Sequence, residues 1–440
     1  MKINFIKLLY EEENNMKKNK GITLVALVVT IVVLLILAGV SINLVLGNNG
    51  IIAKAQEAKT KQAEASENDL KGMNSLIEQM ESTLNGSGNG GKTEPDTVPY
   101  LPSDDFHYDT STSVDTGLVI KDGSGNEYVW VVVPRTTAVY AKTGLGKTTF
   151  TDADYTSIEN DLKEYTKTYR GSISYLDTWY ADDKNEGWLT PGEYTELKNS
   201  MLKSVYENGG FYVGRYEAGI AENRTIEGPK NSDGKYTIEG MPTPVSKADA
   251  YPYTYVTRTQ AQNLASNVNS GTKTSSLMFG VQWDLVLAFM HNKGNIADST
   301  LTSNSTTIGN YYNSTFDLNR GKYAQYNKLG NPWNNFDSAL GSIVVSNETT
   351  GKMKKIEQSS YSNGILLTTG GTERSNVMNI YDIAGNVSEW TLEKASRTSD
   401  PCAFRGGNFT DAGSSIAAAS RRSNSTDYSD STLGFRVSLF

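Results

Sequence analysis

The sequence predicts an α+β head domain on a long N-terminal transmembrane helix. An uncharged run of 33 residues, Gly21–Ala53, precedes a helix-forming segment and a glycine-rich linker. Beyond the linker, predicted strands and amphipathic helices alternate with turns. The chain has 40 glycines, 25 tyrosines and only 38% hydrophobic residues. We therefore expect many turns and an amphipathic aromatic surface rather than one large aliphatic core.

Charge and rare residues exclude several classes of function. The net charge of −8 argues against a nucleic-acid partner, because phosphate binding needs a basic face. The two histidines, His107 and His291, are far apart, which argues against zinc sites and histidine-based triads. Cys402 is the single cysteine, so no internal disulfide can form.

The N-terminal apolar run is long enough to span a membrane. As a helix, residues 22–46 would be ~37 Å long, against a hydrocarbon core of ~30 Å. Lysines at 17, 18 and 20 precede it, which predicts a cytoplasmic N-terminus and an extracellular head on a single-pass protein of the cell membrane. A cleaved signal peptide is the alternative, but the run is long and no small-x-small site follows it.

The lysine-rich leader, Gly21 and the Ile22-Thr-Leu-Val sequence together resemble the N-terminus of type IV pilins and type II secretion pseudopilins. The resemblance implies a leader over residues 1–21, which a prepilin peptidase removes between Gly21 and Ile22. It also implies pilin-like subunits as partners in a pilus-like surface assembly. The fifth mature residue of that family is usually Glu, whereas this chain has Ala26. This departure leaves processing in place but puts polymerisation in doubt.

A helix should continue beyond the membrane. Residues 54–67 are good helix formers. After them, apolar residues recur at spacings of three and four, at Leu70, Met73, Ile77, Met80 and Leu84. We expect one transmembrane and amphipathic helix over 22–84 that packs against its own head; a short coiled coil is the alternative. The Gly-Ser-Gly-Asn-Gly-Gly sequence predicts a flexible linker over 85–100, and the head then covers 101–440.

Local patterns predict the first elements of the head. Residues 118–120 and 127–133 flank an Asp-Gly-Ser-Gly turn and predict a hairpin. Residues 190–206 predict a helix with a proline at its start. Residues 246–265 are expected to be extended, and residues 277–293 to be helical.

The segment Tyr381–Trp390 combines two acids with a tight turn. Gly385 and Asn386 favour the turn, because both tolerate a positive φ. The carboxylates of Asp382 and Glu389, together with backbone carbonyls, could surround a hard cation. Alternatively, the two acids cap and brace the turn by accepting backbone N–H groups.

Three motifs, Tyr381–Trp390, Arg405–Phe409 and Leu433–Val437, follow one another toward the C-terminus. In this order they resemble the formylglycine-generating enzyme (sulfatase-modifying factor) family, and Phe211–Ala218 is similar to an early strand of that family. The resemblance covers the chain from about residue 118 to its end. It implies that the head has a variant of the C-type lectin fold.

The resemblance does not carry the family's oxidase activity. Active members use two C-terminal cysteines, which bind copper and react with oxygen. Counting back from Gly434 places these positions at Gly413 and Ala418, and neither can supply a thiolate. Cys402 lies before the Arg-Gly-Gly motif and has no partner. We therefore expect that the protein is not an enzyme.

The family's calcium site does map onto this chain. The resemblance assigns its ligands to the side chains of Asp382 and Glu389 and to the carbonyls of Gly385 and Val387. All of these ligands are oxygens, as calcium requires.

The segment Asn408–Thr432, which we call the polar segment, is small and polar in composition. It is either a turn-rich region braced by Arg421 or Arg422, or a ligand-binding face on a rigid scaffold. Lectin-fold variable proteins of diversity-generating retroelements place their mutable residues in this position. We expect the segment to lie largely on one exposed face and its contacts to come from Asn408, Thr410, Asp411, Ser420, Asn424, Asp427 and Tyr428.

The sequence leaves three competing hypotheses about function. The leading one is an adhesin-like surface protein whose head binds an extracellular glycan or protein. The second is a structural minor pilin or pseudopilin, with which Ala26 is compatible. The third is a formylglycine-type oxidase, which the missing cysteines argue against.

Overall fold

The computed structural model describes residues 99–440, except 172–173, 338–342, 347–354 and 359. Contacts divide the chain into Met1–Gly90 and Gly91–Phe440. The predicted leader, the processing site at Gly21 and Ile22, the membrane span and nearly all of the linker lie outside the described residues. Within the described part, no helix is both long and apolar enough to cross a membrane.

The C-terminal strand lies inside the largest sheet. This six-stranded sheet has the order β1 (His107–Tyr108), β2 (Val119–Lys121), β3 (Glu127–Val132), β5 (Gly210–Gly214), β19 (Val437–Leu439) and β8 (Ser275–Leu277). Strand β19 lies between β5 and the edge strand β8 and is antiparallel to both, with Ser438 opposite Val213 on one side and Ser276 on the other. The predicted hairpin is confirmed as β2 and β3.

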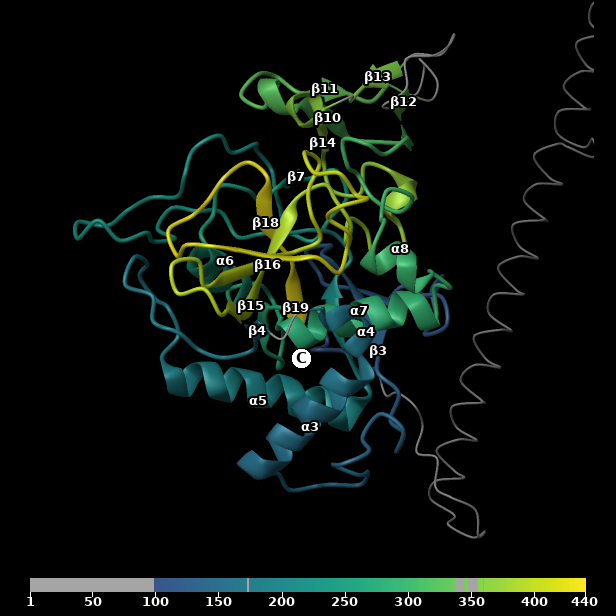
Figure 1. Cartoon of the computed structure of the whole chain (residues 1–440), viewed down its shortest axis with the longest axis vertical. Helices are drawn as coiled ribbons and strands as arrows, with labels where there is room; N and C mark the ends of the chain where they lie inside the picture. Colours follow the sequence, from purple (N-terminus) through teal and green to yellow (C-terminus); the bar gives the residue numbers. More distant parts are fainter. Residues whose placement is uncertain (1–98, 172–173, 338–342, 347–354, 359) are drawn as a thin grey trace, which may run out of the picture. The chain divides into compact units, whose positions relative to one another are not determined.

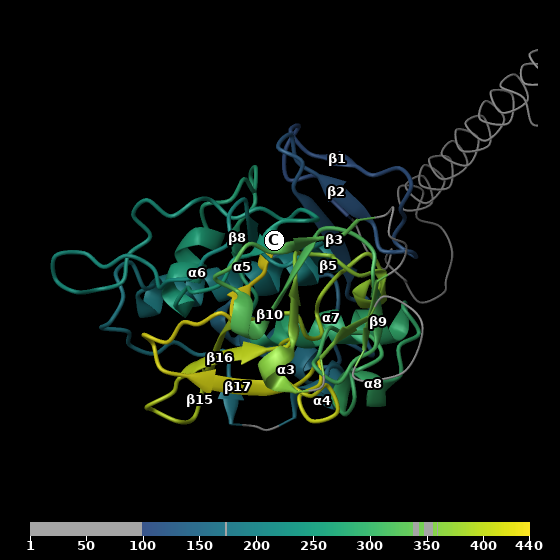
Figure 2. The ribbon, with the colours of Figure 1, turned by 90° about the horizontal axis from the view of Figure 1, so that it is seen from above.

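A second sheet brings the three sequence motifs together. It contains β17 (Arg421–Asn424), β16 (Cys402–Arg405), β15 (Ser388–Ala395) and β18 (Leu433–Phe435), and β4 (Tyr175–Leu176) pairs with β15. Glu389 on β15 lies opposite Arg405 on the antiparallel β16 and opposite Gly434 on the parallel β18. Figure 2 shows β16 and β17 side by side.

Three smaller sheets complete the strands. They are β9 (Phe316–Leu318) with β12 (Ile343–Ser346) and β13 (Lys355–Glu357); β10 (Lys322–Gln325) with β11 (Asn334–Asn335) and β14 (Ile365–Leu367); and β6 (Gly219–Ile220) with β7 (Tyr251–Pro252). Short 3-10 turns occur along this part of the chain: η1 (Tyr326–Lys328) between β10 and β11, η3 (Tyr361–Asn363) between β13 and β14, and η4 (Glu373–Ser375) between β14 and β15. In Figure 1 the first two of these sheets lie at the top of the head, far from the helices at its base.

The described helices are α3 (Asp152–Tyr165), α4 (Lys167–Arg170), α5 (Pro191–Asn208), α6 (Arg258–Ala265), α7 (Gly280–Asn292) and α8 (Asp298–Thr302). The helices predicted over 190–206 and 277–293 are confirmed as α5 and α7. The prediction of an extended 246–265 is wrong from residue 258 onward. A capping box causes the helix there: Thr257 Oγ1 accepts from the Gln260 N–H, and the Gln260 side chain accepts from the Thr257 N–H.

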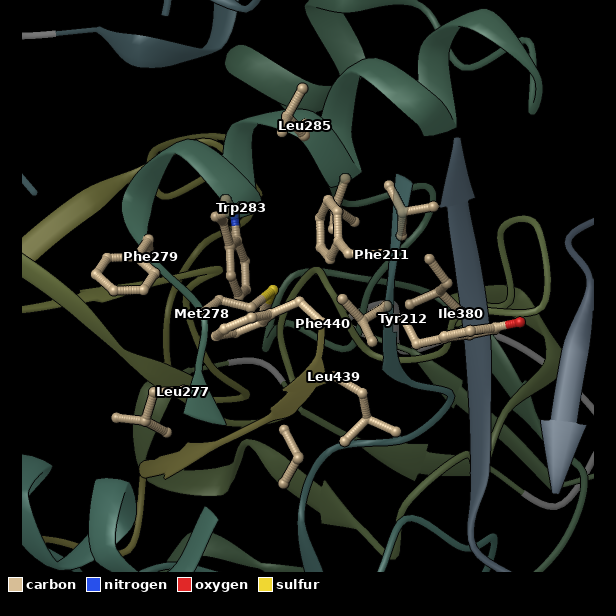
Figure 3. Packing of buried hydrophobic residues seen from close by; sticks show 14 of the residues in the cluster. Phe211, Tyr212, Leu277, Met278, Phe279, Trp283, Leu285, Ile380, Leu439 and Phe440 are labelled. Carbon is tan, nitrogen blue, oxygen red and sulfur yellow. The ribbon is translucent and has the colours of Figure 1, made fainter. Parts of the chain in front are cut away.

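The core joins the largest sheet to α7. Phe211 on β5, Met278 and Trp283 near the start of α7, and Phe440 at the C-terminus lie close together (Figure 3), and Leu439 belongs to the same cluster. Each of these side chains is at most 4% exposed, and complete burial of such a side chain contributes roughly 1.5–3 kcal/mol. The C-terminus is therefore held in the core, which fixes the motifs that precede it.

Candidate functional site

The turn between Asp382 and Glu389 is buried and docks on Asn310. Asp382, Gly385 and Asn386 all have positive φ, at 62°, 74° and 55°. A Cβ on Gly385 would lie 2.2 Å from the Asn310 carbonyl oxygen, so only glycine fits there. The Asn386 side chain accepts from Asn310 Nδ2 at 3.0 Å and from the Leu367 N–H at 3.1 Å. The turn predicted from the sequence is therefore fixed by its contacts with Asn310 and Leu367.

The Asp382 carboxylate braces the chain around this turn. Oδ1 accepts from Ser375 Oγ at 2.6 Å, and Oδ2 accepts from the Gly370 N–H at 2.7 Å. The side chain is 2% exposed, and this burial raises the pKa of Asp382 despite the two hydrogen bonds.

Glu389 forms a buried ion pair with Arg436. Arg436 Nη2 lies 2.7 Å from Glu389 Oε1, and Nε lies 3.1 Å from Oε2. Arg436 also donates to the carbonyls of Gly214 at 2.9 Å and Tyr381 at 2.8 Å. Burial raises the pKa of Glu389, whereas Arg436 opposes that rise. One guanidinium therefore connects the last motif to the turn and to β5.

Glu217 is a third buried acid beside this turn, and it is not among the site residues predicted from the sequence. Its carboxylate accepts from Asn386 Nδ2 at 2.7 Å and from the Val387 N–H at 3.1 Å. Burial and then the charges of Asp382 and Glu389 raise its pKa well above the usual value. The available signal was an acidic residue three positions after the apolar strand β5 and directly before Ala218, Gly219 and Ile220.

Asp382 accepts a backbone N–H group, from Gly370, as the bracing alternative expects, whereas Glu389 accepts from the Arg436 guanidinium. All four carboxylate oxygens of Asp382 and Glu389 accept a hydrogen bond from the protein. No group of three or more His, Cys, Asp or Glu side chains among the described residues is arranged to hold a metal ion.

Carboxylate and carbonyl oxygens are nevertheless the ligand types that a hard cation prefers. The carboxyls of Glu217, Asp382 and Glu389 all interact with Arg436, and carboxylate oxygens keep lone pairs beyond one hydrogen bond. An ion would use Asp382, Glu389 and the carbonyls of Gly385 and Val387. Calcium binding there stays a prediction.

The positions aligned with the family's cysteines are filled. A Cβ on Gly413 would lie 2.6 Å from the Tyr311 ring, and Ala418 is fully buried. Cys402 is also fully buried, and its Sγ lies 2.6 Å from the Tyr180 hydroxyl. Burial raises the pKa of the Cys402 thiol, which disfavours the reactive thiolate.

Arg421 fixes the middle of the polar segment to the core. Its guanidinium contacts Glu393 Oε1 at 2.9 Å and the Asp284 carboxylate at 2.6 and 2.7 Å. Arg405 lies 2.9 Å from the same Asp284 and 3.3 Å from the same Glu393. Burial raises the pKa of Glu393, but Arg421 and Arg405 outweigh it and lower that pKa to about 2. These four side chains form a buried charge network under β17.

Arg422 braces the start of the polar segment. It pairs with Asp411, whose Oδ1 lies 3.0 Å from Nη1. The expectation that Asn408 is exposed is wrong, since this residue is 4% exposed. Its Oδ1 accepts from the Thr410 N–H at 2.9 Å and hydroxyl at 2.7 Å, so the side chain turns inward to close a local turn.

The rest of the polar segment is mostly half-buried, so the expectation of a largely exposed face is wrong. Residues 421–424 pair with β16, and this pairing draws the segment into the sheet. Asp427 is exposed and accepts from Ser425 Oγ at 2.6 Å. Tyr428 is half-buried and donates to Asp430. The remaining candidates, Thr410, Asp411, Ser420 and Asn424, are all half-buried, and a binding role for any of these residues stays a prediction.

Tyr326 extends this surface and was not selected from the sequence. It is 38% exposed, its ring centroid lies 6.0 Å from that of Phe409, and it interacts electrostatically with Tyr428. Since η1 is distant from the polar segment in sequence, no local pattern could have placed it there.

Comparison with known proteins agrees with this C-terminal part of the site. Residues 291–439 match the family described as sulfatase-modifying factor enzyme 1-like domain. That range includes the turn at Gly385, the Arg405 motif and Arg436, and residues 291–439 are therefore a sulfatase-modifying-factor-like domain within a head of mixed α and β structure.

The crystal structure of CarF is similar at 14% identity, with 52% of this chain and 85% of that chain covered and a TM-score of 0.28. Treponema denticola variable protein 1 is similar at 12% identity, with 71% and 84% covered and a TM-score of 0.21. Likenesses this distant add no argument about function. No curated protein matches the chain.

Proposed function

We propose that this protein is an adhesin-like cell-surface protein whose head binds an extracellular glycan or protein. The observation that supports the proposal is the construction of the polar segment. Arg421 pairs with the buried Glu393 and Asp284. Arg422 pairs with Asp411 within the segment. These ion pairs fix the backbone of the segment. Asn424, Asp427 and Tyr428 remain partly or fully accessible on that rigid support. Polar residues held on a rigid scaffold are typical of binding surfaces.

A non-enzymatic role is part of the proposal. The family's oxidase needs two thiolates, whereas Tyr311 fills the space beside Gly413 and Cys402 is buried against Tyr180. These contacts support binding over formylglycine-type oxidation.

Anchoring follows from the N-terminal sequence. We propose that residues 22–46 hold the protein in the cell membrane and that a prepilin peptidase cuts after Gly21. A structural minor pilin or pseudopilin is the second candidate, because Ala26 replaces the usual Glu. Mass spectrometry of the mature N-terminus tests the cut; a terminus beyond Leu46 would indicate an ordinary signal peptide.

Adhesion tests the binding function. Cells displaying the full chain are compared with cells displaying the triple variant Asn424→Ala, Asp427→Ala and Tyr428→Ala. Asp427 is exposed, while Asn424 and Tyr428 are half-buried and Tyr428 packs at the edge of the core, so the variant should stay folded with a small fall in melting temperature and lose adhesion. Matched substitutions at Ser414 and Ser415, which are exposed in the same segment, serve as the control. Full adhesion by a folded triple variant would contradict this assignment of the binding face.

A further inference from the structure

A groove lies beside the polar segment, on the small sheet of β10 and β11. Its volume is about 410 Å³, within the range of ligand sites in proteins. Its walls include the Tyr323 ring and four polar side chains, those of Gln325, Lys328, Asn331 and Asn334. None of these residues belongs to the turn, the buried ion pairs or the polar segment described above.

The polar side chains of this groove differ from those of the polar segment in their contacts. Asn408, Asp411 and Asp430 each bind another group of the segment. By contrast, the side chains of Gln325, Lys328, Asn331 and Asn334 have no hydrogen bond or ion pair to any described residue. Among the described residues, therefore, no protein group competes with a ligand for the donors and acceptors of these four side chains.

Two exposed tyrosines lie on the turns next to the groove. Tyr326 shares η1 with Lys328 and is 38% exposed. Tyr361 on η3 is 65% exposed, and η3 is tied to η1 by the hydrogen bond from the Tyr326 N–H to the Gly364 carbonyl at 2.9 Å. Tyr326 also packs near Phe409 and interacts electrostatically with Tyr428, so η1 connects this part of the head to the polar segment.

We propose that this groove is an oligosaccharide-binding site. The inference rests on the proposed binding function and names the ligand class and its location. Sugar hydroxyls both donate and accept hydrogen bonds, and the amides of Gln325, Asn331 and Asn334 do the same. Tyrosine rings offer flat apolar faces for the C–H faces of sugar rings, with a hydroxyl at the edge.

The lining argues against a peptide ligand. Its apolar part consists of three side chains of small or moderate size, those of Ala324, Pro332 and Ile356, and its described residues include no arginine. Peptide and protein interfaces usually depend on buried aromatic or arginine anchors. Among the described residues of the lining, Lys328 is the one with a charge, so the lining does not demand a charged ligand.

A glycan array tests the proposal with the full chain in detergent micelles. We expect at least one oligosaccharide to bind, and we expect Asn331→Ala with Asn334→Ala to weaken that binding at least tenfold. Tyr326→Ala should weaken it as well. The matched control is Asn160→Ala with Asn267→Ala, two exposed asparagines elsewhere on the head. Thermal melting of every variant verifies the fold.

The outcomes separate this inference from the proposed function. Absence of binding to any oligosaccharide on the array overturns the groove assignment, as does binding that the groove variants leave unchanged. If only the triple variant at 424, 427 and 428 loses oligosaccharide binding, the assignment to the groove is wrong and the oligosaccharide binds at the polar segment. Failure of adhesion by displayed wild-type protein would instead contradict the proposed function itself.

Discussion

Arg436 and Glu389 lie 2.7 Å apart in the core of the head, although 47 residues separate them in the sequence. Both side chains are at most 1% exposed. Because the same guanidinium donates to the Tyr381 and Gly214 carbonyls, it joins the C-terminal motif, the turn and β5. The motifs around Tyr381, Glu389 and Arg436 therefore contribute buried contacts that stabilise the fold of the head.

Removing the guanidinium from this pair should lower the free energy of unfolding. Arg436→Leu leaves the buried Glu389 carboxylate unpaired, so we expect the free energy of unfolding to fall by about 3–5 kcal/mol. Arg436→Lys should also lower it, because a lysine cannot replace the forked geometry. Urea unfolding measures both changes. Arg397 is exposed and paired only with Asp400, so Arg397→Leu should leave the midpoint unchanged; a loss as large as that of Arg436→Leu would contradict the role of the pair.

Acid should weaken the charge network beneath β17. The folded pKa of Glu393 is about 2, below the ordinary value of about 4.3. A lowered pKa means that ionised Glu393 stabilises the fold above about pH 4.5, and that this contribution is lost as the pH falls toward 2.

The variant Glu393→Gln isolates that contribution. It should lower the free energy of unfolding by about 3 kcal/mol at pH 7, because Arg421 and Arg405 lose a shared carboxylate. The difference from wild type should narrow progressively below pH 4.5. Unfolding in urea at several pH values measures it, and a difference that does not change with pH would show that Glu393 is not ionised in the fold.

Local patterns predicted much of the fold, and contacts distant in sequence account for what they missed. The hairpin of β2 and β3 and the helices α5 and α7 have clear local signals. Helix α6 was missed because a single capping box begins it within a polar stretch.

The candidate site was predicted less completely, because it too depends on contacts between residues that are distant in the sequence. The turn at Gly385 is a local feature, but its partners Glu217 and Asn310 come from other parts of the chain. Composition suggested an exposed polar segment, whereas pairing of β17 with β16 and the ion pairs of Arg421 and Arg422 draw it inward. A polar composition cannot distinguish residues that bind a ligand from residues that bind each other.

Calcium is expected to raise the melting temperature of the full chain. Three buried carboxyls interact with one guanidinium at the turn, and a cation bound only to the folded state stabilises it by mass action. At a calcium concentration of 100 times Kd, this stabilisation is about 2.7 kcal/mol. Melting is compared in calcium and in EGTA, with Asp382→Asn as the variant that should lose the difference. Coincident wild-type curves would show that Asp382 and Glu389 only brace the turn.

Restoring the family's two cysteines should not restore a copper site. Tyr311 is fixed beside Gly413, since its hydroxyl donates to the Gly406 carbonyl at 2.7 Å and its own carbonyl accepts from Gln358 at 2.9 Å. A Cβ at position 413 would therefore meet a ring that cannot easily move, and such overpacking costs about 1–3 kcal/mol. We expect Gly413→Cys with Ala418→Cys to be destabilised and to bind no Cu(I) in a competition assay with a chromophoric chelator. Gly413→Ala should show a similar loss of stability without a thiol, which separates the steric effect from the chemistry. Stoichiometric Cu(I) binding by a double variant as stable as wild type would contradict this account, because it would mean that only the thiols were missing from an otherwise preserved site.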